Sequence, residues 1–411
     1  MYISRNIEKI IEKQSKRFKI LILIGAREVG KTSLLKNLAF SANRKYVSLK
    51  DLIIRDLALT DPPLFLQRYA PPVIIDDIQY ALPLFQYIKN YANKKDFTGS
   101  IWITSSQLFP LLENTIQNSY ENIGVINLLG LSLDEIYKSG NNIPFLPTLE
   151  NLNQIANNKN TQNLNSIYKL IWQGSFPAFY KNDTNIDWQS YYSSYVQNLL
   201  QQDISKLLQI NDEMVFFRFL CAAASQTGRI VNYAELAKAA GISAPTAKQW
   251  VKILEAAKIV YMLQPFMPPG SKYVVKAPKI FFYDTGLAAY LTRWNNPDSL
   301  ETGAQSNDFF TTWVIMEIYK SYSNICIIPP IYYLRNFNGK EIGLIIYINK
   351  IAYPIIIDKS ANPEKATKLF SILEPVAHDA NISIGPGAVI CFIDALTTST
   401  KNIHYVPAWI I

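Results

Sequence analysis

The sequence predicts a multidomain α/β protein whose N-terminal domain is a doubly wound parallel sheet. Short apolar runs alternate with helical segments as far as Leu129, the pattern of parallel strands joined by crossover helices. Residues 139–165 contain two prolines and many asparagines, which marks a loop or domain link. A second mixed pattern of helices and strands begins near Asp284. We expect an α/β domain at residues 1–140, a helical linker with a winged-helix-like module at 141–283, and another α/β domain at 284–411.

The composition excludes several classes of protein. Hydrophobic residues make up 49% of the 411-residue chain and charged residues 18%, so the chain is not largely disordered. Three cysteines without a Cys-x-x-Cys pair, and only two histidines, exclude a disulfide scaffold, a zinc ribbon and a His-based metal site. No apolar run approaches the roughly 18 residues of a membrane span, and residues 1–19 lack the apolar segment of a signal peptide. We expect a reduced, cytoplasmic protein with no membrane segment.

The net charge of +8 is concentrated near the N-terminus. The first 50 residues hold twelve Lys or Arg and three Asp or Glu, so the rest of the chain is close to neutral. A phosphate-binding site or a DNA-facing patch explains such a cluster, and so does a solvated lysine face on the first helix. The sequence leaves these three explanations open.

Five apolar segments rich in β-branched residues are predicted as strands of the N-terminal sheet. They are residues 19–24, 46–49, 73–77, 101–104 and 125–129. An amphipathic helix is predicted at residues 3–17, because isoleucines recur there at helical spacing, and another helix at residues 33–40.

A glycine-rich loop between the first strand and the next helix carries the strongest chemical signal. It reads Gly25-Ala26-Arg27-Glu28-Val29-Gly30-Lys31-Thr32 and is followed by Ser33. Backbone N–H groups of such a loop, and of the helix that it opens, surround nucleotide phosphates. Lys31 is predicted to reach the β- and γ-phosphates, and the Thr32 hydroxyl to bind Mg²⁺. We therefore predict that these nine residues bind ATP.

Acidic and polar residues end the neighbouring strands. Asp76 ends an apolar strand and is predicted to bind Mg²⁺, and Asp77 follows it where a catalytic acid would orient the attacking water. Thr104 ends the next strand, within the sequence Thr-Ser-Ser-Gln at 104–107, and is predicted to sense the γ-phosphate. The alternative is that these residues only terminate strands.

The middle of the chain is predicted to be mostly helical, with a helix-turn-helix at residues 228–262. Its helices are marked by cap residues: Asn232 with Glu235 as a capping box, Gly241, and Ser243. Strand-like runs at 259–263 and 273–283 follow as a wing. Lys248, Gln249 and Lys252 lie on the second helix, where such a module reads DNA. Winged modules also contact proteins, so either partner fits.

The C-terminal region predicts a helix, three strands, another helix and two last strands. The helices are expected at 309–319 and 363–377, and the strands at 331–334, 342–348, 353–357, 388–393 and 404–409. Asn338-Gly339 is a hairpin turn signal between the first two of these strands.

Several motifs occur in a fixed order along the chain. They are Gly-Ala-Arg-x-Val-Gly-Lys-Thr at 25–32, Ile-Ile-Asp-Asp-Ile-Gln at 74–79, Thr-Ser-Ser-Gln at 104–107, Leu-Ser-Leu-Asp-Glu at 131–135, Gly-Ser-Phe-Pro at 174–177 and Lys-Ile-Phe-Phe-Tyr-Asp-Thr-Gly-Leu at 279–287. This order resembles a group of prokaryotic AAA-type P-loop ATPases. In that group a C-terminal domain with a restriction-endonuclease-like fold follows the ATPase. The resemblance covers nearly the whole chain and implies ATP and Mg²⁺ as ligands.

The ATPase part departs from that group at the residues that speed hydrolysis. The usual Gly-Arg pair is replaced by Glu121-Asn122, and no arginine occurs between Arg68 and Arg218. An arginine finger contributes about 10³–10⁵ in rate, and lysine lacks its planar fork. Asp77 also stands where the group usually has a longer glutamate. We expect ATP binding with slow hydrolysis, unless Arg218 or a partner supplies the charge.

The C-terminal part departs further. The resemblance implies a nuclease Mg²⁺ site with an acid at a helix start, an aspartate on the second strand and Glu-x-Lys on the third. These positions hold Asn307, Gly343, and Ile357-Asp358-Lys359. The neighbouring acids Asp308, Glu341 and Asp358 are expected to point elsewhere, because side chains alternate along a strand. We predict an inactive nuclease-like domain.

Three functions remain after the sequence analysis. The first is a slow Mg²⁺-dependent ATPase with accessory domains, and the second is a non-hydrolysing switch or scaffold that binds ATP and docks a protein or DNA partner. The third, an ATP-dependent nuclease, is disfavoured by the missing acids. The sequence does not determine the oligomeric state.

Overall fold

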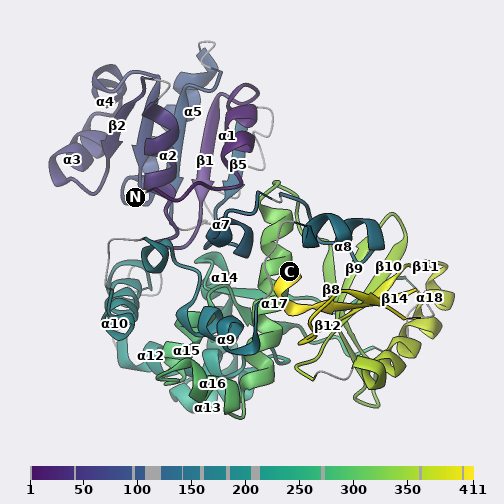
Figure 1. The fold of residues 1–411 in the computed structure, drawn as a ribbon. Helices are drawn as coiled ribbons and strands as arrows, with labels where there is room; N and C mark the ends of the chain where they lie inside the picture. Colours follow the sequence, from purple (N-terminus) through teal and green to yellow (C-terminus); the bar gives the residue numbers. More distant parts are fainter. Residues whose placement is uncertain are drawn as a thin grey trace.

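The computed structural model describes residues 2–40, 43–94, 98–106, 122–140, 142–157, 162–181, 186–204, 213–269, 274–360, 363–399 and 402–411. In this part of the chain the strands form a five-stranded, a two-stranded and a seven-stranded sheet. Figure 1 shows the five-stranded N-terminal sheet at one end of the molecule, the seven-stranded C-terminal sheet at the other, and the helices of the middle region between and below them.

The N-terminal sheet is entirely parallel, with the strand order β2-β3-β4-β1-β5. Its strands are β1 (Ile20–Ile24), β2 (Lys45–Ser48), β3 (Val73–Asp76), β4 (Ile101–Ser105) and β5 (Ile123–Asn127). Its helices are α1 (Glu8–Ser15), α2 (Lys31–Phe40), α3 (Leu52–Thr60), α4 (Pro62–Arg68) and α5 (Leu82–Lys94), with the short 3-10 helix η1 (Ile78–Tyr80) after β3. Every residue of β1 is buried, as expected for a strand covered on both faces.

The order of the strands explains why the predicted site residues meet. Strand β4 lies between β1 and β3, so the loop after β1 and the acids after β3 emerge on either side of Thr104. All three strands run in the same direction, and therefore their carboxyl ends share one edge of the sheet. The predicted doubly wound parallel sheet is confirmed for this domain.

Two N-terminal elements differ from the sequence prediction. The first helix begins at Glu8 rather than at residue 3, because Arg5 turns inward and is only 5% exposed. Strand β5 ends at Asn127, two residues before the predicted end, and the chain then closes over the glycine-rich loop. A Cβ atom on Gly25 would lie 2.1 Å from the Leu128 carbonyl oxygen, so only glycine fits there.

The middle region is helical, as predicted, and contains a compact unit of three helices and a two-stranded sheet. The elements before this unit are α7 (Leu133–Tyr137), α8 (Leu149–Ala156), α9 (Leu164–Gln173), η2 (Pro177–Tyr180), α10 (Trp188–Asn198) and the π-helical η3 (Leu199–Ile204). The unit itself comprises α12 (Glu213–Ser225), α13 (Tyr233–Ala240), α14 (Ala244–Ala256), β6 (Val260–Leu263) and β7 (Lys279–Phe282). Trp250 of α14 packs on Phe216 and Phe219 of α12.

The predicted helix caps are present, with one exception. Asn232 accepts from two backbone N–H groups of α13, and Ser243 accepts from the Thr246 N–H at 3.2 Å. Gly241 ends α13 with a left-handed φ of +71°. Glu235 accepts instead from the Gln226 side chain at 3.4 Å, so the predicted reciprocal capping bond is replaced. The predicted loop at 139–165 also contains α8, which Thr148 caps and which buries Leu152 and Ile155.

The C-terminal sheet is mixed, with the order β13-β14-β12-β10-β9-β8 and β11 beside β10. Its strands are β8 (Ile331–Arg335), β9 (Glu341–Ile348), β10 (Ile351–Ile357), β11 (Ser383–Ile384), β12 (Gly387–Cys391), β13 (Thr397–Thr398) and β14 (Ile403–Pro407). The helices are α15 (Thr285–Leu291), α16 (Pro297–Thr302), α17 (Ser306–Ser323), η4 (Pro363–Ile372), α18 (Leu373–Ala380) and η5 (Ala408–Ile410). The predicted hairpin turn is confirmed, since Gly339 has a φ of +80° between antiparallel β8 and β9.

The long helix α17 lies in an apolar core that the three regions share. One continuous apolar core runs from β1 through the middle helices to the C-terminal sheet, and most of α17 is buried in it. Helices α15 and α16 pack against α9, so the elements on both sides of the predicted boundary at residue 284 are in contact. Within the described residues no helix has the length and apolar character to cross a membrane.

Candidate functional site

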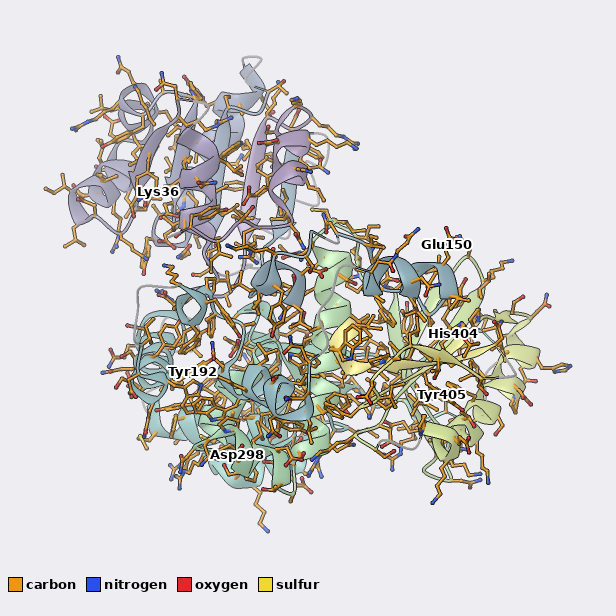
Figure 2. The ribbon with its side chains drawn as sticks, viewed as in Figure 1. Lys36, Glu150, Tyr192, Asp298, His404 and Tyr405 are labelled. Carbon is orange, nitrogen blue, oxygen red and sulfur yellow. The ribbon has the colours of Figure 1, made fainter. Side chains whose placement is uncertain are left out.

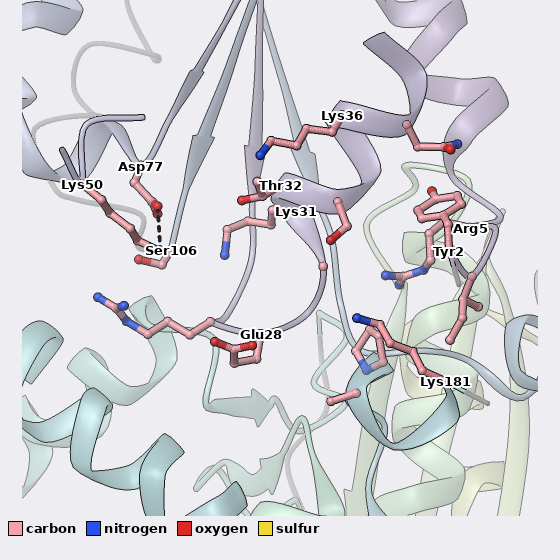
Figure 3. Close-up of a pocket in the computed structure, with 17 residues that line it drawn as sticks. Tyr2, Arg5, Glu28, Lys31, Thr32, Lys36, Lys50, Asp77, Ser106 and Lys181 are labelled. Atoms are coloured by element: carbon pink, nitrogen blue, oxygen red, sulfur yellow. Dashed lines mark ion pairs between the residues drawn. The ribbon is translucent and has the colours of Figure 1, made fainter. Parts of the chain in front are cut away.

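A cavity of about 590 Å³ lies at the carboxyl edge of the N-terminal sheet (Figure 3). Its walls come from the N-terminal segment, the glycine-rich loop with the start of α2, the ends of β2, β3 and β4, and the turn around η2. The lining residues are Tyr2, Ile3, Arg5, Arg27, Glu28, Gly30, Lys31, Thr32, Ser33, Lys36, Asn37, Lys50, Asp77, Ser106, Pro177, Ala178 and Lys181.

The glycine-rich loop has the backbone of a phosphate-binding loop. Glu28 and Gly30 adopt left-handed φ values of +64° and +96°, as in loops whose successive N–H groups form a concave anion-binding site. The Lys31 ammonium donates to the carbonyl oxygens of Gly25 at 2.8 Å and Ala26 at 2.7 Å. Gly25, Ala26 and Val29 form the buried back of the loop, whereas the other loop residues line the cavity.

Thr32 and Asp76 lie together, as the sequence predicts for Mg²⁺ ligands. The Thr32 hydroxyl donates to the Asp76 carboxylate at 2.9 and 3.0 Å. Tyr46 on β2 donates to the same carboxylate at 2.7 Å, and burial, reinforced by this hydrogen bond, raises the pKa of Tyr46. Among the described residues no cluster of three or more His, Cys, Asp or Glu side chains exists. One carboxylate and one hydroxyl fit Mg²⁺ in nucleotide sites, where phosphates and water supply the other oxygens.

Asp77 lines the cavity in a restrained conformation. Its φ of +61° is left-handed, which turns its side chain away from the direction that an extended strand would give. The Gln79 amide donates to one carboxylate oxygen at 2.7 Å, and the Lys50 ammonium lies 3.1 Å from the other (Figure 3). Burial disfavours charged Lys50, but the Asp77 carboxylate outweighs this effect and the pKa of Lys50 is raised.

Thr104 does not line the cavity, contrary to the predicted γ-phosphate sensor. Its side chain is fully buried behind Asp76. The hydroxyl donates to Asp76 at 2.5 Å and accepts from the Asp77 N–H at 2.8 Å, so it fixes the relative position of the two acids. Ser106, the residue directly after β4, lines the cavity instead. Gln107 and Glu121 lie outside the described residues.

Arg5 is a buried structural residue. Its guanidinium donates to Glu135 at 2.9 Å, to the Val29 carbonyl of the loop at 2.9 Å, and to the Leu129 carbonyl at 2.8 Å. Both members of the Arg5–Glu135 ion pair are buried. This network fastens the N-terminal segment and the end of β5 to the loop. The only sequence signal was the basic cluster in the first 50 residues.

That basic cluster is partly explained by the cavity. Arg5, Arg27, Lys31, Lys36 and Lys50 all line it, while lysines of α1 such as Lys9 and Lys13 are exposed. The phosphate-site explanation therefore accounts for one part of the cluster and the solvated helix face for another. Lys36 also lies over the Tyr46 ring at 3.8 Å.

The opposite wall of the cavity comes from the middle region. Pro177, Ala178 and Lys181 contribute to it from the Gly-Ser-Phe-Pro turn. Buried Asp284 holds this turn by accepting from the Ser175 N–H and from the Tyr192 hydroxyl, each at 2.7 Å. A Cβ atom on Gly174 would lie 2.2 Å from the Tyr192 oxygen, so glycine is required. Arg218, considered above as a source of charge, is exposed on α12 and is not one of the described lining residues.

The C-terminal residues that correspond to a nuclease site have other partners. The Lys359 ammonium is ion-paired with Glu301 and donates to the Ser306 hydroxyl at 2.9 Å. Asn307 is exposed, Gly343 has open space around its Cα, and Ile357 is half-buried against the core.

The neighbouring acids are also engaged elsewhere. Asp308 pairs with Arg229 at 2.6 Å, Glu341 pairs with Lys279, and Asp358 accepts from the Ser360 N–H at 2.9 Å. Within the described residues these acids do not gather into a metal-binding group.

The second helix of the predicted helix-turn-helix presents its polar residues to solvent. Lys248, Gln249 and Lys252 are all exposed on α14, and the opposite face carries the buried Trp250 and Leu254. The exposed face is therefore available to a partner.

Two family models match separate parts of the chain. Residues 17–137 match an AAA domain, and residues 164–298 match a domain of unknown function, DUF8612. The first range contains the glycine-rich loop and the acids of β3, and it supports an AAA-type P-loop ATPase domain that binds nucleotide. The restriction-endonuclease-like and winged-helix assignments stay predictions.

Two uncharacterized mycobacterial proteins are similar to most of the chain. Mb2031c of Mycobacterium bovis and Rv2008c of Mycobacterium tuberculosis are each 20% identical over 357 residues, covering 87% of this chain and 74% of each relative.

Among solved structures, the Walker-type ATPase PABY2304 of Pyrococcus abyssi is 13% identical, with a TM-score of 0.43, covering 71% of this chain and 96% of that chain. The RuvB Holliday junction branch migration motor of Thermotoga maritima is 17% identical, with a TM-score of 0.30, covering 62% and 88%. Similarities at this level support no conclusion about function.

Proposed function

We propose that the chain binds Mg²⁺-ATP in the N-terminal cavity and hydrolyses it slowly. The observation that supports this most is the convergence of the P-loop, of Thr32 beside Asp76, and of Asp77 around one cavity of about 590 Å³. Nucleotide phosphates need N–H donors, a cation and a metal-binding oxygen pair, and each is present at the edge of the same sheet.

In this proposal Lys31 and the loop N–H groups bind the phosphates. The Lys31 ammonium is directed into the loop by two carbonyl oxygens. Carbonyl oxygens are neutral acceptors, whereas phosphate oxygens are negatively charged and attract the ammonium more strongly. When a triphosphate binds, its oxygens would therefore replace the two carbonyl oxygens as acceptors for the Lys31 ammonium, without a change in the loop backbone.

Thr32 and Asp76 would hold Mg²⁺, with Tyr46 and Thr104 orienting the carboxylate from behind. When bound, Mg²⁺ would offset the negative charge of the β- and γ-phosphates. The hydrogen bonds from Tyr46 and Thr104 to Asp76 are of the kind that orients a metal ligand and fixes its position.

Asp77 would orient the attacking water, and its surroundings support slow turnover. Gln79 and Lys50 contact its two carboxylate oxygens, so the attacking water must compete with both. Aspartate is also one methylene shorter than glutamate and reaches less far. Release of Asp77 from Lys50 is therefore expected to precede each turnover.

A nucleotide-dependent switch is the second candidate, supported by the wall that the middle region contributes. Lys181, Pro177 and Ala178 face the P-loop across the cavity, so a bound nucleotide would touch two domains at once. The exposed lysines of α14 would then present a surface to DNA or to a protein. In both candidates the C-terminal domain is an inactive nuclease-like domain that serves as a docking surface.

Calorimetric titration with ATP and Mg²⁺ tests the proposal. The wild-type chain should bind one ATP, and Lys31→Ala should show no detectable binding while its circular dichroism spectrum stays unchanged. Lys9→Ala, an exposed lysine outside the cavity, is the matched control. Equal ATP affinity in Lys31→Ala and wild type would show that the site is misassigned. Turnover measured alone and with DNA then separates the ATPase from the switch.

A further inference from the structure

We propose that the side chain of Arg27, from within the P-loop itself, supplies the transition-state charge that an arginine finger supplies in other phosphoryl-transfer enzymes. The inference rests on the proposed ATP hydrolysis at this site. It assigns Arg27 a role in the reacting state, beyond the contribution of its backbone to phosphate binding.

The position of the Arg27 guanidinium supports this role. Arg27 leaves the loop after β1, yet its Nη2 atom donates to the Tyr80 hydroxyl at 3.3 Å. Tyr80 belongs to η1, which begins directly after Asp77. The guanidinium therefore lies toward the side of the cavity where Asp77 is, and in this proposal the γ-phosphate lies between Asp77 and Lys31.

The electrostatics agree with this position. Burial and the Arg27 guanidinium both act to lower the pKa of the Lys50 ammonium, although Asp77 outweighs them. Arg27, Lys50 and Asp77 all line the same cavity. A space flanked by two cations and one carboxylate is suited to a group that gains negative charge as it reacts.

Two other arginines near the cavity each form several hydrogen bonds within the fold. Arg5 is buried, and its guanidinium donates to Glu135 and to two backbone carbonyls. Arg55 donates to the Leu49 and Lys50 carbonyls and lies over the Tyr80 ring at 4.5 Å. Arg5 and Arg27 are the arginines that line the cavity in the described part of the chain. The sequence contains none between Arg68 and Arg218.

Arg27 donates to a neutral hydroxyl group, whereas Arg5 is paired with a buried carboxylate. The hydrogen bond from Arg27 to Tyr80 is long and joins it to a neutral hydroxyl, which is a weaker partner than a phosphate oxygen. Tyr80, held by Arg55, thus acts as a positioning residue that keeps the guanidinium near the reacting atoms. In the proposed transition state the planar fork of Arg27 donates to two γ-phosphate oxygens.

The chemistry requires a cation at this place. In hydrolysis the water oxygen bonds to the γ-phosphorus while the bond from that phosphorus to the bridging oxygen breaks. The electron pair of the broken bond stays with ADP, and the proton of the water passes by way of Asp77 to the released phosphate. Charge spreads over the equatorial γ-oxygens in the transition state, and a guanidinium can donate to two of them at once.

Binding of ADP with aluminium fluoride, a mimic of the transferring phosphoryl group, tests the proposal on the full chain. In Arg27→Ala the affinity for ADP–aluminium fluoride should fall by about 100-fold or more, while the affinities for ATP and ADP change by less than about threefold. Arg27→Lys keeps the charge but not the fork, and should recover only a small part of the lost affinity. Tyr80→Phe should weaken binding of the mimic by a smaller factor.

Arg68→Ala is the matched control, because Arg68 is exposed on α4 and does not line the cavity. Unchanged affinity for the mimic in Arg27→Ala would overturn the proposal. Equal losses for ATP, ADP and the mimic would also overturn it, because they would indicate a ground-state binding role. If the wild-type chain binds no ATP at all, the proposed function fails first, and that result is distinguishable because every variant then behaves alike.

Discussion

The N-terminal cavity and the C-terminal sheet edge both carry lysines and carboxylates, but they use them differently. In the cavity, Lys31 contacts backbone carbonyls and Asp76 contacts hydroxyl groups. At the C-terminal edge, Lys359 is paired with Glu301, and Asp308 is paired with Arg229. Figure 2 shows the two regions apart, with Lys36 in the first and Asp298, on the same helix as Glu301, beside the second.

The difference shows how a binding site can be distinguished from a similar structural cluster. Neutral partners hold a charged side chain in place at little cost and can be displaced by a ligand of opposite charge. A side chain that already forms an ion pair must first lose that partner, and the remaining charge stays behind. This comparison favours ligand binding by Lys31 and Asp76 in the N-terminal cavity and structural roles for the C-terminal cluster. Asp77 is the exception in the cavity, because it is ion-paired with Lys50 and must be released before it can act.

One expected effect in the cavity concerns Asp76. Asp76→Asn keeps the size of the side chain and removes its charge, so the contribution of Mg²⁺ to ATP affinity should fall by about 10–100-fold. Titration with ATP in Mg²⁺ and in EDTA separates this contribution from phosphate binding. Asp56→Asn, an exposed position on α3, is the control. An unchanged Mg²⁺ dependence in Asp76→Asn would remove Asp76 from the metal site.

The ion pairs of the two regions should also differ in their effect on stability. Arg5→Ala leaves the buried Glu135 carboxylate without its partner, which should cost about 3–5 kcal/mol. Arg229→Ala breaks a pair with Asp308 whose arginine side chain is 52% exposed, and this should cost about 0–1 kcal/mol. Denaturant unfolding followed by tryptophan fluorescence measures both. Similar costs for the two variants would contradict the view that Arg5 fastens the P-loop.

Restoring acids at the C-terminal edge should change its metal binding. The triple variant Asn307→Asp, Gly343→Asp and Ile357→Glu should bind Mn²⁺, which the wild type should not bind. The substitution at Gly343 should be tolerated, because a Cβ atom there meets no atom within 4 Å. Plasmid cleavage with Mg²⁺ or Mn²⁺ should be absent in the wild type. Wild-type cleavage that is lost in Lys359→Ala would show that the domain is an active nuclease.

The smallest expected effect is a pH dependence confined to the C-terminal sheet. Burial lowers the pKa of His404, and its Nδ1 atom lies 3.1 Å from the Thr398 hydroxyl oxygen. Neutral His404 is therefore favoured in the folded chain, so its stabilising contribution is complete above the unfolded pKa of about 6.5 and is lost as the pH falls. The stability difference between wild type and His404→Gln should shrink on acidification. A constant difference would contradict this assignment.

The sequence predicted the parallel sheet and the P-loop because both are local patterns. The apolar run before Gly25 is itself the strand that it predicts. The cap residues Asn232 and Ser243 stand directly before the helices that they predict. Arg5, Tyr46 and Lys50 were missed because their partners lie far along the chain or across the sheet, where no sequence spacing reveals them. Thr104 was assigned to the cavity because it ends a strand, but the neighbouring strand β3 places Asp76 in front of it.

Electron paramagnetic resonance of Mn²⁺, titrated into the full chain with ATP, tests the central contrast most directly. The account predicts one bound Mn²⁺ per chain, dependent on ATP and strongly weakened in Asp76→Asn. A Mn²⁺ that binds without ATP, survives Asp76→Asn and disappears when Glu301 or Asp358 is replaced would contradict it, because the C-terminal carboxylates would then hold a metal that their ion pairs and hydrogen bonds should exclude.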